Sequence, residues 1–195
     1  MSIEGSVSQS ASAGANTVTL PASDLTIVGI YAGTYYMSIV LNAGENAIIP
    51  INTPSRNVQP VTFKPGTNSI TYSVPTACTA VFYYGTPLPG AKPLSVFKGV
   101  VATESPTAAG TGTFTMAFPK ASNGRMTGEI ALLSASTTLF TFNSAVGKTI
   151  SFQEFTGEFQ GIEFINPVNL PLSNSLTVTY TSQAAQTFYF VLYYS

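Results

Sequence analysis

The chain of 195 residues has no histidine and no tryptophan, and it has one cysteine, Cys78. Without histidine there is no Ser-His-Asp triad, no Cys-His pair and no imidazole ligand for a metal ion. A single cysteine also excludes an internal disulfide, a Cys-x-x-Cys redox pair and a zinc ribbon. We therefore predict no catalytic residue, no cofactor and no metal site. We interpret Cys78 as a small core residue of a strand.

Charge is scarce as well. The chain has 7 basic and 8 acidic residues, which make up 8% of it and leave a net charge of −1. Charged residues make up about 25% of a typical soluble domain. So few scattered cations give no electrostatic footprint for nucleic acid or for an anionic membrane surface. A net charge near zero also leaves little electrostatic repulsion between copies, so the composition favours a protein that self-associates.

No run is long and apolar enough to predict a membrane-spanning helix, which needs about 20 predominantly apolar residues. The strongest window, residues 25–41, has no charge but is interrupted by threonine, serine and tyrosine. Its β-branched residues favour strands, and we interpret it as a hairpin that turns at Ala32 and Gly33. The first six residues lack the basic and apolar segments of a signal peptide, so we expect no export by the usual route.

Short runs of aromatic and β-branched residues, separated by Gly, Pro, Asn and Ser, predict an all-β fold. Apolar residues make up 45% of the chain, which is enough for a buried core. Many short strands with regular turns indicate an antiparallel β-sandwich or jelly-roll type of fold. The predicted strands are 16–20, 25–31, 34–41, 46–51, 58–63, 68–74, 78–84, 95–102, 112–118, 125–133, 137–142, 148–155, 158–165, 174–181 and 186–194.

The two halves of the chain resemble each other. Residues 68–71, Asn-Ser-Ile-Thr, are echoed by Asn-Ser-Leu-Thr at 174–177, and both precede an aromatic strand that ends in a tyrosine pair. We predict two tandem related β-sandwich or barrel units, 1–90 and 91–195, the first with a flexible N-terminal arm of about residues 1–15. A proline-rich stretch near residue 90 suits a linker. The alternative is a single jelly roll over 16–195, because strands rich in serine and threonine look alike by composition.

Glu154, Glu158 and Glu163 form the one acidic cluster that suggests a glycosidase. Such enzymes need two carboxyl groups about 5–9.5 Å apart across a cleft. Residues 153–160 are typical of a hairpin with its turn at Thr156 and Gly157, and in that register Glu154 and Glu158 point to opposite faces. We therefore interpret the pair as protecting a sheet edge or aiding solubility, rather than as catalytic.

Tyrosine is abundant and suits protein interfaces, because it combines a large apolar ring with a hydrogen-bonding tip. In a tyrosine doublet on a strand, one side chain should face outward when the other faces inward. Core packing remains the competing interpretation for each of them. The candidate interface residues are Tyr35, Tyr36, Tyr83, Tyr84, Tyr193 and Tyr194.

Taken together, an all-β chain of low charge, rich in Ser, Thr and Tyr and without a catalytic set, resembles virion structural proteins in general character. We expect a capsid, capsid-decorating or spike component, located in the virion and assembled in the host cytoplasm. Its expected partners are copies of itself and other virion proteins, with possible host-surface contact and no nucleic acid. The alternative is a cell-surface binding module or adhesin that recognises glycan or protein, and an enzyme ranks third.

Overall fold

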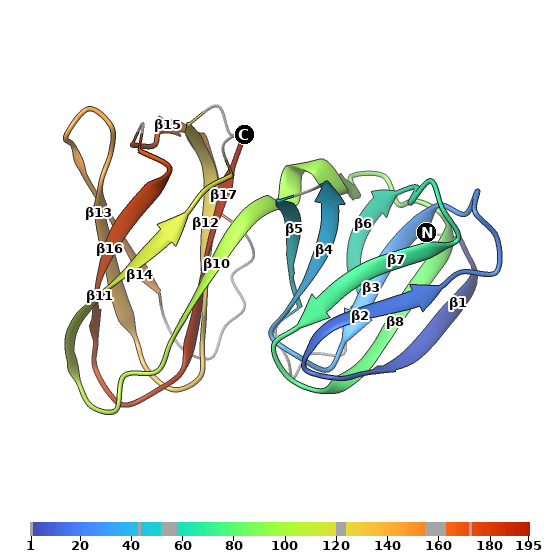
Figure 1. The fold of residues 1–195 in the computed structure, drawn as a ribbon, viewed down its shortest axis with the longest axis horizontal. Helices are drawn as coiled ribbons and strands as arrows, with labels where there is room; N and C mark the ends of the chain where they lie inside the picture. Colours follow the sequence, from blue (N-terminus) through green and yellow to red (C-terminus); the bar gives the residue numbers. More distant parts are fainter. Residues whose placement is uncertain (1, 43, 52–57, 120–123, 155–162, 172) are drawn as a thin grey trace. The chain divides into compact units, whose positions relative to one another are not determined.

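The computed structural model describes residues 2–42, 44–51, 58–119, 124–154, 163–171 and 173–195, and side chains are not described for 163–166. The predicted all-β class is confirmed: these residues form mainly antiparallel strands and one short 3-10 helix (Figure 1). Contacts divide the chain into two compact units, Met1–Lys98 and Gly99–Ser195. Within the described ranges, no helix is long and apolar enough to cross a bilayer.

The first unit consists of two sheets. One has the strand order β1-β8-β3-β6-β9, and the other has the order β5-β4-β7-β2. Every described pair is antiparallel except β6 with β9. The elements are β1 (Ser2–Ala11), β2 (Gly14–Thr19), β3 (Ile27–Ala32), β4 (Tyr36–Asn42), β5 (Glu45–Pro50), β6 (Gln59–Phe63), β7 (Ser69–Val74), β8 (Cys78–Thr86), β9 (Lys92–Pro93) and the 3-10 helix η1 (Leu94–Phe97).

The second unit also pairs two sheets, with the strand orders β10-β17-β12-β15 and β14-β13-β16-β11. These strands form where apolar residues alternate with small polar ones, as in β11, where Phe114 and Met116 are buried between exposed threonines. The elements are β10 (Lys98–Glu104), β11 (Gly110–Ala117), β12 (Arg125–Leu133), β13 (Thr138–Asn143), β14 (Thr149–Glu154), β15 (Glu163–Asn169), β16 (Ser175–Ser182) and β17 (Phe188–Tyr194).

Aromatic side chains join the two sheets within each unit. In the first unit, Tyr72 of β7 meets Phe82 of β8 edge to face, with ring centroids 5.2 Å apart. In the second unit, Phe140 of β13 lies 4.6 Å from Phe190 of β17, centroid to centroid. Burying an aromatic side chain of this size contributes about 1.5–3 kcal/mol. Each unit is thus a β-sandwich with its own core, and the chain is not a single closed barrel.

The two units share one strand order. Subtracting nine from each strand number of the second unit turns its sheets into 1-8-3-6 and 5-4-7-2, which are the orders found in the first. They also share an irregularity. β3 shifts register between Ile27 and Gly29 along β8, and β12 shifts between Met126 and Gly128 along β17.

The echoed Asn-Ser motifs occupy matching places. The backbone carbonyl of Asn68 accepts a hydrogen bond from the Leu20 amide at 2.7 Å, and that of Asn174 accepts one from the Phe118 amide at 2.9 Å. These bonds match residue 20 with residue 118.

Three features differ from the prediction. The expected arm is instead strand β1, because a backbone ladder to β8 needs no large side chains. The expected hairpin at Ala32 and Gly33 is wrong: β3 pairs with β8 and β6, whereas β4 pairs with β5 and β7, so the turn connects two sheets. The stretch after residue 90 belongs to the first unit, because β9 pairs with β6.

Candidate functional site

One outer sheet face of the second unit has only uncharged side chains. It belongs to the sheet β14-β13-β16-β11, whose inward residues fill the core while the alternate residues point outward. We call this surface the threonine face. Its residues are Thr111, Thr113, Thr115 and Ala117 of β11, Ser175, Thr177, Thr179 and Thr181 of β16, Leu139, Thr141 and Asn143 of β13, and Thr149, Ser151 and Gln153 of β14.

Register places the threonines opposite one another across the strands. Thr111 pairs with Thr181, Thr113 with Thr179 and Thr115 with Thr177. Such cross-strand neighbours are about 4.5–5.5 Å apart at Cβ. The result is a regular array of hydroxyl and methyl groups, which could contact a neutral partner without desolvating any charge.

Hydrogen bonds between side chains hold parts of this array in place. The hydroxyl groups of Thr111 and Thr181 are 3.1 Å apart, and Thr149 donates to Asn143 Oδ1 at 3.2 Å. Because these side chains are already ordered by one another, a partner that meets them loses less side-chain entropy than it would with free lysines or glutamates.

The first unit has a smaller surface of the same kind. Along the β2–β7 pair, Thr17 lies opposite Thr71 and Thr19 lies opposite Ser69. Thr17, Thr19 and Thr71 are exposed, and Val18 between the two β2 threonines is buried. The Thr-x-Thr alternation was visible in the sequence, but only the strand pairing shows that the threonines meet on one face.

Strand β1 forms the second candidate surface. It stands at the end of its sheet, and among the described residues its backbone ladder is to β8 alone (Figure 1). Ser6, Ser8 and Ser10 are exposed on the outer face, while Val7 and Gln9 alternate with them and are half-buried. One long side of its backbone is therefore open, and backbone groups on such an edge can pair with another strand.

The six candidate tyrosines fall into two groups. Tyr35, Tyr36, Tyr83 and Tyr84 are half-buried, so part of each side chain stays accessible. Tyr193 and Tyr194 are buried, with 0% and 2% exposed, so they cannot contact another molecule in the folded chain. The expectation that one member of each doublet faces solvent is therefore wrong for this pair.

Tyr193 and Tyr194 are both buried because both sides of β17 are covered. All seven residues of that strand are buried. Tyr194 packs edge to face on Phe118 with ring centroids 5.8 Å apart. Tyr193 lies against Gly99, where an added Cβ would come within 3.1 Å of its ring. Burial, with a smaller contribution from the charge of Glu129, raises the pKa of Tyr193 well above its usual value.

The acidic cluster is only partly described. Glu154 ends β14, Glu163 begins β15 opposite Glu129 of β12, and Glu158 with the predicted turn lies outside the described residues. Glu129 is 1% exposed. Among the described residues, no three His, Cys, Asp or Glu side chains gather in a way that could hold a metal ion.

A charged pair lies at the C-terminal end of the first unit. Lys98 Nζ is 3.3 Å from Glu45 Oε1, and Asn42 Nδ2 donates to Glu45 Oε2 at 2.8 Å. The hydrogen bond from Asn42, followed by that from Lys98, lowers the pKa of Glu45 from 4.5 although burial opposes the shift. The pair holds Lys98, the last residue of the first unit, against the start of β5.

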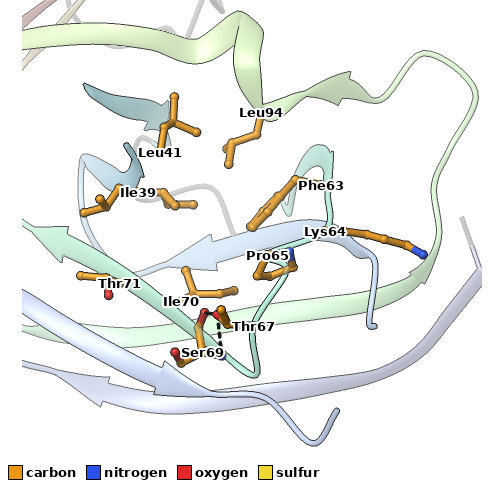
Figure 2. A pocket seen from close by; sticks show the side chains of 11 residues that line it. Ile39, Leu41, Phe63, Lys64, Pro65, Thr67, Ser69, Ile70, Thr71 and Leu94 are labelled. Carbon is orange, nitrogen blue, oxygen red and sulfur yellow. Dashed lines mark hydrogen bonds between the residues drawn. The ribbon is translucent and has the colours of Figure 1, made fainter. Parts of the chain in front are cut away.

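The first unit also has a pocket of about 280 Å³. Strands β4 and β7 pair only at Ser38 with Ser73 and at Ile39 with Tyr72, and the pocket opens where they diverge. Figure 2 shows that the Lys64 side chain extends away from the apolar cluster. The apolar side chains that line the pocket include Ile39, Leu41, Phe63, Ile70 and Leu94.

Cys78 lies at the start of β8 and is half-buried rather than in the core. Burial raises the pKa of its thiol, so the reactive thiolate is disfavoured.

Comparison with known proteins does not assign the chain to a family. No family model matches the chain, and no curated protein matches it. Among solved structures, the chain is similar to the crystal structure of the stem and receptor binding domain of the spike protein P1 from bacteriophage PM2. That match has 9% identity and a TM-score of 0.23, and it covers 96% of this chain and 77% of that one. A TM-score this low does not establish a common fold.

Proposed function

We propose that this chain is a non-enzymatic structural protein of a virion, a capsid, capsid-decorating or spike component that assembles in multiple copies. The observation that carries the proposal is the threonine face, an outer sheet surface on which no charged side chain stands. A protein that remains separate in solution normally covers such a surface with charges of both signs. Many weak neutral contacts, repeated by symmetry, give a stable assembly.

The arrangement of the chain supports the same proposal. Two sandwich units with one strand order present related surfaces twice in each copy, and we interpret each unit as a sandwich of the jelly-roll type. The jelly roll is a common architecture of capsid proteins. The proposal places the protein in the virion, assembled in the host cytoplasm, with copies of itself and other virion proteins as partners.

Sedimentation of the purified chain over a range of concentrations and salt tests the proposal. We expect concentration-dependent association that changes less than about twofold between 50 and 500 mM NaCl, because neutral contacts are not screened. Replacing Thr113 and Thr179, which are cross-strand partners, with lysine should weaken association and leave the melting temperature nearly unchanged. The Ser23→Lys variant, at an exposed turn of the first unit outside both threonine surfaces, is the matched control. A strictly monomeric wild type with no affinity for any particle would contradict the proposal.

The alternative is a surface binding module, and the pocket of the first unit is the observation that favours it. The half-buried Phe63 ring lines this pocket together with other apolar side chains, and Thr67 and Ser69 line it as well. An apolar site with a few polar groups is typical of ligand binding. Titration of the chain with glycans tests this: binding by the monomer that is lost in Phe63→Ala, with the fold retained, would favour the alternative over assembly.

A further inference from the structure

The free edge of β1 lacks the features that usually prevent pairing with another chain. Edge strands are normally blocked by proline, by lysine, by inward-pointing charge or by brevity. β1 is 10 residues long, contains no proline or lysine, and has Glu4 as its one charged residue. Its irregularity, between Ile3 and Gly5, lies near the N-terminal end and leaves residues 5–11 in continuous register with β8.

Other edges described in the structure are less open. β9 at the far end of the same sheet consists of Lys92 and Pro93. β15 contains Pro167 and a register shift along β12. The β2 edge is partly capped, because the Gln9 side chain donates to the Thr17 carbonyl at 3.2 Å.

Strand β11 is another long edge and contains no charged residue, whereas β14 at the opposite end of its sheet is shorter and ends in Glu154. β11 contains two glycines, Gly110 and Gly112, and β1 contains one, Gly5, at the end of its regular stretch; glycine weakens a strand. Strand β1 is thus the edge best suited to accept another strand.

We propose that β1 pairs antiparallel with β1 of a second copy, about a two-fold axis at Ser8. This inference rests on the proposed function, because it names one of the contacts by which copies assemble. Residue 8 is the centre of the regular stretch 5–11. With Ser8 opposite its own symmetry mate, all seven residues of that stretch are paired, and each sheet continues into the next across the axis.

On both faces of the β1–β1 pair, the side chains of the two copies are chemically compatible with one another. On the outer face Ser6 lies opposite Ser10 of the partner, so small hydroxyl groups meet one another. On the inner face Val7 lies opposite the partner's Gln9. Glu4 falls outside the paired stretch, so no like charges meet across the axis. A second copy is favoured over a charged partner because the exposed face of residues 5–11 has no charge to attract one.

A charge-swap experiment at Ser8 tests the inference in the full chain. Ser8 is exposed and pairs with Val81 of β8, so a lysine or glutamate there can extend into solvent. Alone, Ser8→Lys or Ser8→Glu brings two like charges together at the axis, and we expect the affinity between copies to fall by about tenfold or more at low salt. Mixing the two variants in equal amounts should restore association, because each pair then has opposite charges.

Ser23→Lys serves as the matched control, because it places the same charge on an exposed turn of the same unit, outside β1 and both threonine surfaces. It should associate like the wild type. Circular dichroism and thermal melting of every variant check that the fold is retained. If Ser8→Lys associates like the wild type, β1 pairing is overturned while the proposed assembly function stands. If the wild type itself stays monomeric at every concentration, both proposals fail.

Discussion

Gln186 connects two corners of the second unit through its side-chain amide. Its Oε1 accepts hydrogen bonds from the backbone amides of Ala135 and Ser136, at 3.3 and 3.1 Å. Its Nε2 donates to the hydroxyl groups of Thr138 and Ser182, both at 2.7 Å. The residue is 8% exposed. These bonds join the corner between β12 and β13 to the corner between β16 and β17.

Gln186→Leu should lower the free energy of unfolding by about 2–4 kcal/mol, because it leaves several buried polar groups without partners. Gln183→Leu is the control, since Gln183 is exposed in the same corner and should change stability by less than about 0.5 kcal/mol. Urea unfolding of both variants measures the difference. Equal stabilities would mean that water replaces the amide and that the network contributes little.

At the scale of the element, two strands are joined by a ring that lies over a glycine. Gly112 of β11 pairs with Tyr180 of β16, and an added Cβ at Gly112 would overlap the tyrosine ring. That ring also packs edge to face on Phe188, with centroids 5.1 Å apart. Glycine at this position is therefore required by the approach of the ring, since only a residue without a Cβ leaves it room.

Gly112→Ala should destabilise the chain by about 1–3 kcal/mol, because the Tyr180 ring must leave its place. In a Tyr180→Ala background the same substitution should cost much less, since the overlapping ring is gone. A double-mutant cycle by thermal unfolding measures this coupling. Additive effects would show that another part of the structure sets the requirement for glycine. Thr111→Ala, one residue away on the exposed face, provides a control.

The sequence predicted most strands of the described chain, because period-two alternation depends only on which residues face the core. Residues 125–133 form β12 with the predicted bounds. The alternation could not reveal β1, where Ser and Gly replace apolar residues and pairing with β8 supplies the order. It also could not assign strands to sheets, so residues 25–41 were interpreted as one hairpin.

The candidate surfaces were predicted less well than the strands. Tyrosine doublets indicated an interface, but Tyr193 and Tyr194 lie on a strand that is covered on both sides. Periodicity assumes one solvated face, and that assumption fails for such a strand. The threonine face depends on residues more than 60 positions apart, such as Thr115 and Thr177, coming together by strand pairing. Local pattern contains no information on that pairing.

At the scale of the whole molecule, each unit has a core of its own. Phe82 is completely buried in the first unit and Phe140 in the second. Replacing either with alanine should cost about 3–5 kcal/mol through lost burial and a cavity. Because domains with separate cores unfold as separate units, the loss should stay within the unit that carries the substitution.

Hydrogen exchange measured by mass spectrometry checks this expectation in the full chain. Phe82→Ala should accelerate exchange in residues 1–98 and leave 99–195 nearly unchanged, and Phe140→Ala should do the reverse. Each variant is thus the control for the other. Faster exchange throughout the chain in both variants would show that the two units unfold as one cooperative body.

The shared strand order has a further consequence for how related genes can gain or lose a unit. The boundary between the units lies at Lys98 and Gly99, at the beginning of a strand that corresponds to β1. Unequal recombination between the two gene segments that encode these units would therefore add or delete one complete sandwich. We expect relatives with one such unit or with three, and a genome survey for chains that contain one or three units would look for them.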